Sequence, residues 1–172
     1  MVKWVELLFC VLQRSSVILE RVATMSMPFQ LLVQEVSLNE VINHAISELP
    51  KECCGLLGGK FEYRLGQRIG VVNSVYRLEN SLKSEVEFLS SADSMFKAYK
   101  EIRQKGEEVL VVYHSHPVSH PVLSKKDLEM IEDTNVLHLI VGNVGKMPEF
   151  GLWWVSEEKK IIPCQMILES KS

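Results

Sequence analysis

Short apolar runs recur along the chain from about residue 29 to residue 168, separated by segments rich in glycine, proline and charged residues. Their length and their content of β-branched and aromatic residues are typical of strands. In EEVLVVYHSH the apolar residues are continuous rather than alternating, which predicts a strand that is buried on both faces. Two adjacent glycines, Gly58 and Gly59, predict a break within the second run. The pattern predicts strands at 29–33, 52–64, 69–80, 107–116, 136–143, 150–156 and 161–168.

Two longer segments have the pattern of helices. Ser37 and Glu40 are three residues apart, as in a capping box, and they predict a helix that begins there and ends at Pro50. The segment 90–106 predicts the clearest helix, and Gly106 is suited to end it. Helical spacing predicts that an apolar stripe on this second helix faces the core, formed by Ala92, Met95, Phe96, Tyr99 and Ile102.

These elements predict one domain of the α/β (α+β) class, with a mixed central β-sheet flanked by helices. The last strands are joined by short, turn-like connections, so they are expected to be antiparallel. Neither an internal repeat nor a low-complexity linker interrupts the chain, and the domain is therefore assigned to residues 28–172.

Residues 1–27 are interpreted as an N-terminal extension. Glu6 breaks the apolar run, which is too short to span a bilayer, and no small-residue cleavage site follows it. An alternative is that translation starts at Met25 or Met27, so that the extension is not part of the protein. A short amphipathic helix is also compatible with the spacing of Trp4, Leu7, Leu8, Val11 and Leu12.

The composition argues against several classes of function. Of the 172 residues, 47% are hydrophobic and 24% are charged, the formal net charge is −3 and the pI is about 6.0. A nucleic-acid partner would favour a basic surface stripe, so neither nucleic acid nor a membrane is expected as a partner. The four cysteines show no C-x-x-C spacing, which favours reduced thiols in a cytoplasmic protein over a zinc knuckle or a disulfide framework.

The segment YHSHPVSHPVLSKKD, residues 113–127, concentrates the candidate chemistry. His114 and His116 are two apart at the end of a predicted strand, so their side chains share a face and can converge on a divalent ion. Asp127 comes from a short helix expected to begin at Ser124. Ser124-x-x-Asp127 is also a capping pattern, so the spacing alone leaves open whether Asp127 serves its helix or a metal. His120 lies in the loop and has no regular geometric relation to the other two histidines.

The sequence HSHP at 114–117, followed at matching spacing by Ser124 and Asp127, resembles the JAMM motif of the MPN/Mov34/PAD-1 metalloproteases. A second segment, LPKECCGLLGG at 49–59, is similar to the P-x-E-x-C-G-L-L-G segment that carries the family's glutamate. Both motifs occur in the family's order, and the resemblance covers roughly residues 29–168. It is closest in size to the compact prokaryotic type, and it implies the cytidine-deaminase-like MPN/JAMM fold.

The resemblance also implies a role for each matching residue. His114, His116 and Asp127 would ligate a zinc ion, Zn2+, as the cofactor. Glu52 would bind the metal-bound water as general acid and base, and Ser124 would hydrogen-bond the oxyanion. Three protein ligands leave a fourth position open, as in catalytic zinc sites. Without the resemblance, Glu52 would be interpreted as a surface charge.

Other residues with reactive or bulky side chains are expected to be structural. Cys53 and Cys54 are interpreted as small residues that permit close packing of the strand, because no partner group for a thiol nucleophile is evident. His44 and His138 are expected to be ordinary helix and strand residues. In the pair Trp153-Trp154, one ring is expected in the core and the other at the surface.

The resemblance implies a zinc-dependent metallopeptidase or isopeptidase. Compact relatives are linked to ubiquitin-fold or sulfur-carrier proteins with Gly-Gly tails, so a peptide or isopeptide bond at such a C-terminal tail is the expected substrate. The alternative is a non-catalytic MPN scaffold, but members of that branch lose the metal ligands. A RadC-type protein of DNA repair is a third alternative, disfavoured by the acidic pI and by Ser115 between the histidines. The sequence leaves open whether the chain forms a homodimer.

Overall fold

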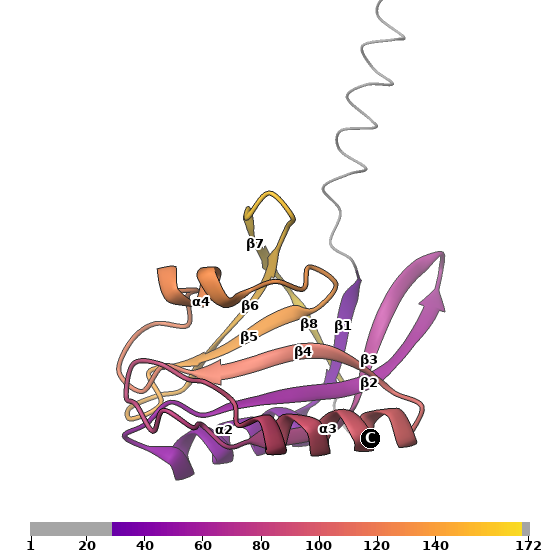
Figure 1. Ribbon diagram of the computed structural model, residues 1–172. Helices are drawn as coiled ribbons and strands as arrows, with labels where there is room; N and C mark the ends of the chain where they lie inside the picture. Colours follow the sequence, from indigo (N-terminus) through magenta and orange to yellow (C-terminus); the bar gives the residue numbers. More distant parts are fainter. Residues whose placement is uncertain (1–28, 170–172) are drawn as a thin grey trace, which may run out of the picture.

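The computed structural model describes residues 29–169, in which helices pack on both faces of a curled β-sheet (Figure 1). The predicted extension, residues 1–27, lies outside the described residues. The helices are α2 (Glu35–Glu48), α3 (Ala92–Gln104) and α4 (Lys125–Met130). The strands are β1 (Gln30–Gln34), β2 (Cys54–Arg64), β3 (Gln67–Leu78), β4 (Glu108–Ser115), β5 (Leu137–Gly142), β6 (Glu149–Val155), β7 (Ile161–Cys164) and β8 (Met166–Glu169).

The strands within residues 29–169 form one sheet in the order β7-β6-β5-β4-β2-β3-β1-β8. Four neighbouring pairs are antiparallel, namely β2–β3, β2–β4, β5–β6 and β6–β7. The pairs β1–β3, β1–β8 and β4–β5 are parallel. Both directions occur in one sheet, so the predicted mixed α/β architecture is confirmed. The predicted break in β2 is a β-bulge, because its register against β3 shifts between Gly58 and Gly59.

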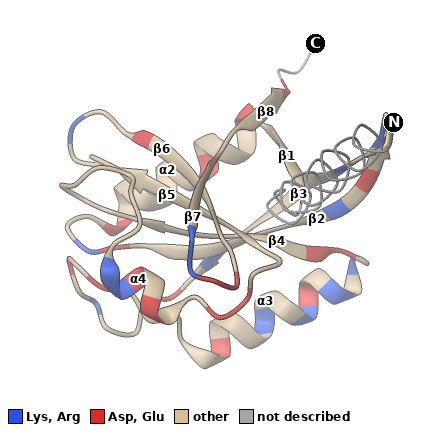
Figure 2. Ribbon diagram, turned by 90° about the horizontal axis from the view of Figure 1, so that it is seen from above, with Lys and Arg blue, Asp and Glu red and all other residues tan. Residues whose placement is uncertain are grey.

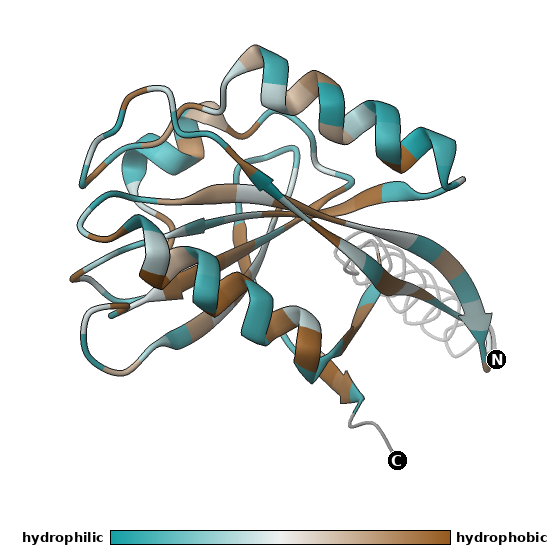
Figure 3. Ribbon diagram, turned by 90° about the horizontal axis from the view of Figure 1, so that it is seen from below, coloured by the Kyte–Doolittle hydropathy of each residue, from teal (hydrophilic) through white to brown (hydrophobic). Residues whose placement is uncertain are grey.

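The helices α2 and α3 cover opposite faces of the sheet (Figure 2). The larger core lies between α2 and the sheet, where Val41 and Ala45 pack in one cluster with Leu31 and Tyr113. A smaller core lies beneath α3, where Ala98 and Ile102 share a cluster with Leu56 and Tyr76. The apolar strands in the middle of the sheet, flanked by helices with polar outer positions, are visible in Figure 3.

The predicted start of the first helix is wrong by two residues. Helix α2 begins at Glu35 directly after β1, and Gln34 occupies the N-cap position without a side-chain hydrogen bond. Ser37 and Glu40 therefore do not form a capping box. The carboxylate of Glu40 lies 3.6 Å from the Arg77 guanidinium instead. The predicted end is confirmed, since α2 ends at Glu48, just before Pro50.

The apolar stripe predicted for α3 is confirmed at Ile102, which is buried, and at Met95, which packs against the same core, but the rest of the stripe faces outward. Ala98 and Ile102 are the buried residues of the helix, whereas Phe96 and Tyr99 are 71% and 51% exposed. The small side chain of Ala98 lets the helix approach the sheet along that row, which turns the aromatic row outward. Ser91 caps the helix by accepting a hydrogen bond from the Ser94 backbone, and Gly106 follows the helix with φ of 63°.

The last predicted strand is two strands separated by Gln165. β7 pairs antiparallel with β6, as predicted for the C-terminal strands, whereas β8 pairs parallel with β1. These partners belong to opposite ends of the strand order, so one residue connects the two edges of the sheet. The sheet therefore curls on itself, which local connection lengths did not predict. Within residues 29–169, none of the helices combines the length and apolarity that crossing a membrane requires.

Gly55 lies where neighbouring strands leave no room for a side chain. A Cβ atom there would lie 2.2 Å from the ring carbon Cζ of Tyr113 and 2.3 Å from the backbone oxygen of Tyr76. Both neighbours are rigid, because the Tyr113 ring is fully buried and the other contact is backbone. The strand that follows Cys53 and Cys54 is therefore closely packed, as expected from its small residues.

We expect Gly55→Ala to lower the free energy of unfolding by about 1–3 kcal/mol, the usual range for overpacking a core. Urea denaturation measures the change. Gly145→Ala is the matched control, because its Cβ would lie 3.7 Å from the Pro117 oxygen, an ordinary contact distance. Equal losses of stability in the two variants would contradict the assignment of Gly55 to a steric constraint.

Candidate metal centre

The C-terminal end of β4 and the N-terminal end of β2 lie side by side, because these two central strands are antiparallel neighbours. The two strands are antiparallel with Cys54 opposite His114, and continuing this register places Glu52 opposite His116. Ser115 connects the end of β4 to Cys53, which precedes β2. Its N–H donates to the Cys53 oxygen at 3.1 Å, and its Oγ accepts from the Cys53 N–H at 2.8 Å. Sheet pairing thus brings two segments about sixty residues apart into one site.

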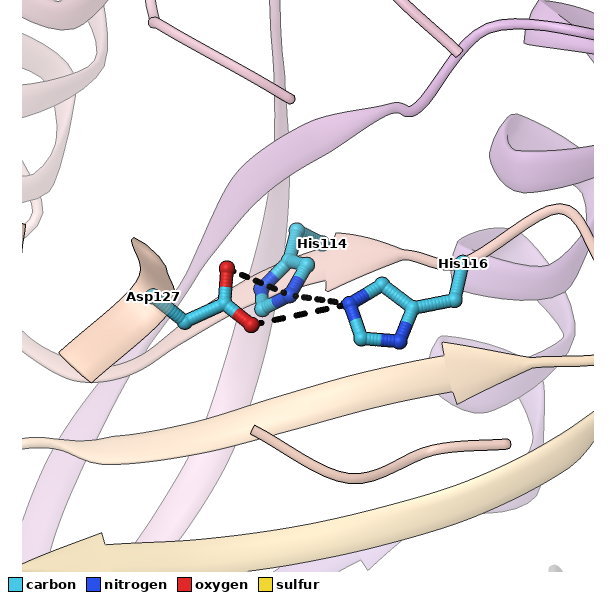
Figure 4. A group of neighbouring side chains, drawn as sticks. All are labelled: His114, His116 and Asp127. Carbon is cyan, nitrogen blue, oxygen red and sulfur yellow. Dashed lines mark hydrogen bonds and ion pairs between the residues drawn. The ribbon is translucent and has the colours of Figure 1, made fainter. Parts of the chain in front are cut away.

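The side chains of His114, His116 and Asp127 converge on one point (Figure 4). The Nε2 atoms of His114 and His116 lie 3.1 Å apart. His114 Nε2 lies 3.5 Å from Asp127 Oδ1, and His116 Nε2 lies 3.6 Å from Asp127 Oδ2. All three residues are buried. The structure therefore brings together the three residues that the sequence predicted as metal ligands.

Asp127 serves its helix and the histidine pair at the same time. Ser124 Oγ accepts a hydrogen bond from the Asp127 N–H at 3.1 Å, and Asp127 Oδ2 accepts one from the Ser124 N–H at 2.6 Å. This is a complete capping box at the N-terminus of α4. The same carboxylate faces both imidazoles, so the two interpretations that the spacing left open hold together. The cap fixes the direction in which the carboxylate points.

The donor atoms fit a single tetrahedral metal ion. Ligand atoms about 2.0–2.1 Å from a tetrahedral zinc ion lie about 3.3 Å from one another. The three observed separations, from 3.1 to 3.6 Å, bracket that value. His116 Nδ1 is 3.1 Å from the backbone oxygen of His120, which can only accept, so Nδ1 carries a proton and Nε2 is the nitrogen whose lone pair is available to a metal. Lone pairs that meet in a buried place favour a cation between them.

The pKa shifts of these three residues also suit a cation-binding site. Burial lowers the pKa of His114 and keeps its imidazole neutral, as a metal ligand must be. Burial opposes ionisation of Asp127, but hydrogen bonds with His114 and His116 hold the pKa of this carboxyl well below its usual range. At His116 burial also opposes the charged form, yet Asp127 and the His120 carbonyl outweigh it and raise the pKa. The site therefore favours positive charge beside a carboxylate.

Glu52 is buried, with only 5% of its surface exposed, so the surface-charge interpretation is wrong. Burial raises the pKa of Glu52 to about 7; His116 opposes this shift, and the negative charge of Asp127 adds to it. A carboxyl with this pKa exchanges a proton readily near neutral pH. The sequence motif located Glu52, but its burial depends on the sheet edge and on the connection that follows β3.

The loop 117–123 lies flat on the sheet beside the metal centre. A Cβ on Gly142 would lie 2.4 Å from the Pro121 nitrogen, and a Cβ on Gly151 would lie 2.0 Å from the Pro121 oxygen. The Trp153 indole N–H donates to that oxygen at 2.9 Å. Gly142, Gly151 and Trp153 thus hold the loop backbone against the sheet. This position fixes the His120 carbonyl, which His116 contacts.

His120 contributes its backbone rather than its side chain. The imidazole is 77% exposed, and its Nδ1 lies 3.4 Å from Glu149 Oε2, outside the group of converging donors. Its carbonyl oxygen accepts from His116 Nδ1, as described above. The histidine that the sequence singled out in this loop therefore acts on the site through an atom that every residue type possesses.

Four further residues that were expected to be structural are buried, namely Cys53, Cys54, His44 and His138. Burial raises the pKa values of Cys53 and Cys54 to about 12, so both thiols remain protonated. His44 and His138 are buried, and burial lowers the pKa of each to about 4. Of the tryptophan pair, Trp154 lies in the core and Trp153 is half-buried, which confirms that the two rings alternate across the sheet.

Two contacts at the site were missed by sequence analysis. The ring of Phe88 stacks on His114 with centroids 4.7 Å apart and an angle of 25° between the rings. Lys126, next to Asp127, forms an ion pair with Glu87. Both partners belong to the connection between β3 and α3, and the sequence offered no regular pattern that would place it here.

Residues 34–156 match the family model described as prokaryotic homologs of the JAB domain. The chain is 35% identical over 124 residues to a desampylase of Pyrococcus furiosus, covering 72% of this chain and 81% of the relative. It is 31% identical over 93 residues to a probable TtuB-protein conjugate cleaving protease of Thermus thermophilus, covering 54% of this chain and 57% of that protein.

Solved structures share the architecture. A protein from Desulfitobacterium hafniense, known from its solution structure, matches with a TM-score of 0.71 and 26% identity over 83% of this chain and 94% of its own. A solution structure from Salinibacter ruber matches with a TM-score of 0.61 and 25% identity over 80% and 90% of the two chains. The mixed sheet with flanking helices is thus a fold that these two solved structures share.

The raised pKa of Glu52 predicts a specific pH dependence of stability in the metal-free protein. The folded chain keeps a proton that the unfolded chain, with an ordinary pKa of about 4.5, has released, so stability falls as the pH rises from about 4.5 to about 7. Glu52→Gln removes this proton exchange. We expect the variant to be more stable than wild type by up to about 3 kcal/mol at pH 8, with the difference shrinking toward pH 5.

Urea denaturation of metal-free protein at both pH values measures this effect. The exposed Glu132 provides the control, because Glu132→Gln should change stability by a similar small amount at each pH. A stability difference between wild type and Glu52→Gln that does not depend on pH would show that Glu52 is ionised in the folded protein at all of these pH values.

Proposed function

The chain belongs to the family of prokaryotic homologs of the JAB domain, and we propose that it is a zinc-dependent metallopeptidase or isopeptidase. The proposed substrate is a peptide or isopeptide bond at the C-terminal tail of a ubiquitin-like or sulfur-carrier protein. The observation that carries the proposal is the buried convergence of His114, His116 and Asp127 beside a buried carboxyl with a pKa near 7.

His114, His116 and Asp127 would hold the metal through two Nε2 atoms and a carboxylate oxygen. This donor set of two imidazoles and one carboxylate suits zinc and leaves a fourth position for water or substrate. When bound, zinc supplies Lewis acidity and lowers the pKa of a water at the open position to about 7. The protein's part is to keep the three donors neutral or ionised as required, and to hold them at fixed separations.

Glu52 would move the proton during hydrolysis. Its carboxylate takes a proton from the attacking water as the oxygen bonds to the scissile carbonyl carbon, and the acid form then gives that proton to the leaving amine. A pKa near 7 suits both halves of this cycle, because neither form is strongly favoured at neutral pH. The burial that sets this pKa also keeps bulk water away from the carboxyl.

Ser124 would donate a hydrogen bond to the oxygen that becomes negative in the tetrahedral intermediate. Its Oγ already accepts from the Asp127 N–H, which fixes the oxygen while leaving its own hydroxyl proton for another acceptor. The residue is exposed, so a substrate carbonyl can reach it. A preorganised donor of this kind stabilises charge that develops in the transition state.

The proposed partner follows from the names of the relatives. One is a desampylase, and the other is described as a probable protease that cleaves TtuB-protein conjugates. A tail that ends in Gly-Gly suits such a site, because residues without side chains can lie close to the metal and the flanking strand. We also propose that the protein acts in the cytoplasm, where its free thiols would remain reduced.

A non-catalytic scaffold of the same fold is the alternative function. A scaffold has no need of three buried donors around a shared point, whereas an enzyme does. Metal content discriminates between the two, since about one zinc ion per chain after purification without added metal supports the enzyme.

We expect the zinc-loaded protein to cleave a sulfur-carrier protein that carries a peptide extension or a lysine conjugate after its Gly-Gly tail. A chelator should abolish cleavage, and added zinc should restore it. Glu52→Gln should lower kcat at least about 100-fold while it retains zinc, because general acid and base catalysis is lost. Mass spectrometry of the products identifies the bond, and intact substrate with zinc-loaded wild type would refute the proposal.

Ser124→Ala, compared with wild type at equal zinc content, tests the oxyanion role against a purely structural one, because the same hydroxyl oxygen also caps the helix that carries Asp127. The variant should lose a helix cap, worth about 1 kcal/mol, and should also lower kcat by about 100- to 1,000-fold. Ser91 caps α3 in the same way, with its Oγ 3.2 Å from the Ser94 N–H. Ser91→Ala should therefore lose comparable stability with kcat unchanged. Similar kcat values for the two variants would contradict a catalytic role for Ser124.

A further inference from the structure

The connection between β3 and α3, residues 79–91, holds the backbone of Glu52 on both sides. The Glu52 N–H donates to the Ser84 backbone oxygen at 2.9 Å. The Glu52 carbonyl accepts from the side-chain Nδ2 of Asn80 at 3.0 Å. Glu52 itself precedes β2, so the strand ladder does not hold these two groups. The connection provides the contacts that a strand neighbour would otherwise supply.

Asn80 is the centre of this connection. Its side chain is buried, and its amide forms hydrogen bonds both as a donor and as an acceptor. Nδ2 donates to the carbonyl oxygens of Glu52 and Glu87 at 3.0 and 3.1 Å. Oδ1 accepts from the backbone N–H groups of Leu82 and Leu89 at 3.1 and 3.0 Å. One side chain therefore closes the connection on itself and attaches it to Glu52.

The same connection reaches the other parts of the site. Phe88 stacks on the ring of His114, and Glu87 pairs with Lys126 at the start of α4. These contacts place the connection against the end of β4 and the helix that carries Asp127. Within this connection, Asn80 and Ser84 hydrogen-bond the Glu52 backbone, whereas Phe88 and Glu87 contact the elements that carry the metal ligands.

We propose that Asn80 is the positioning residue of Glu52: its amide holds the Glu52 backbone so that the carboxyl keeps its place beside the metal centre. This inference rests on the proposed function of Glu52 in proton transfer. The two donated bonds require N–H groups, which an aspartate lacks, and the two accepted bonds require an oxygen, which an alanine lacks. Asparagine supplies both in a side chain short enough to stay buried.

The inference predicts that kcat and metal binding respond differently. Asn80 contacts none of His114, His116 and Asp127, so zinc stoichiometry and affinity should be unchanged in its variants. Displacing Glu52 by a fraction of an ångström should lower kcat by about 10- to 100-fold with little change in KM, because orientation is lost while the binding surface remains. A merely structural residue would lower stability without separating kcat from KM.

The test compares Asn80→Asp and Asn80→Ala with Asn73→Asp, which makes the same chemical change at an exposed position of β3. Asn80→Asp keeps the acceptor for Leu82 and Leu89 but removes the donor to Glu52. Asn80→Ala removes both without adding charge. A loss of kcat in both Asn80 variants, with zinc bound as in wild type and Asn73→Asp unaffected, supports the proposal. Wild-type kcat in either Asn80 variant overturns it.

Amide hydrogen exchange gives a readout that needs no activity. In the wild-type protein the amides of Glu52, Leu82 and Leu89 should exchange with one common opening free energy, because one side chain closes the structure that protects them. In Asn80→Asp the Glu52 amide should lose protection, while the His116 amide, bonded to the Val141 oxygen, keeps it. Unchanged protection of Glu52 in that variant overturns the proposal even where no substrate is cleaved.

These two readouts separate the inference from the proposed function. If wild type cleaves no carrier protein, the exchange measurement still decides whether Asn80 holds Glu52. If wild type cleaves the carrier and Asn80 variants lose Glu52 protection without losing kcat, the proposed function stands and the positioning role is refuted. Should an Asn80 variant fail to fold, different opening free energies for the Glu52, Leu82 and Leu89 amides in wild type would still overturn the proposal.

Discussion

The structure depends on holding two imidazole nitrogens and a carboxylate at one buried point, where a shared proton or a metal ion must offset their lone pairs and negative charge. Two imidazole nitrogens and a carboxylate approach within 3.1 to 3.6 Å, away from water that could otherwise solvate them. Each donor is fixed by a different device: a strand end for His114, the His120 carbonyl for His116 and a helix cap for Asp127. A bound metal ion would be attracted by all three donors and would offset the cost of holding them together away from water.

Structural and chemical tasks coincide in single residues at this site. Asp127 completes a capping box and faces two histidines, and Ser124 caps the helix while its hydroxyl proton remains free to donate. The seating of loop 117–123 on Gly142 and Gly151 likewise acts through its backbone on His116. Local folding rules therefore position the chemistry, and a substitution that disturbs a cap or a close backbone contact also disturbs the site.

Local patterns in the sequence predicted the parts of the molecule that local geometry determines. The strand that carries His114, the short helix capped by Ser124 and the mixed sheet follow from runs of apolar residues, from capping chemistry and from connection lengths. Contacts between distant backbone groups were not predictable. The burial of Glu52, the carbonyl of His120, the amide of Asn80 and the parallel pairing of β8 with β1 all depend on where the sheet places remote segments. The outward turn of Phe96 depends on the small size of Ala98, which polarity patterns do not weigh.

Anomalous diffraction at the zinc absorption edge, from crystals of the protein grown with zinc, tests the central claim most directly. One peak is predicted, about 2.0–2.1 Å from the Nε2 atoms of His114 and His116 and at a similar distance from a carboxylate oxygen of Asp127. Glu52 should lie beside the open position without binding the ion itself. Two results would contradict the account. One is a zinc peak elsewhere in the crystal with none between these three side chains, and the other is a peak near the histidines that leaves Asp127 bonded only to its own helix.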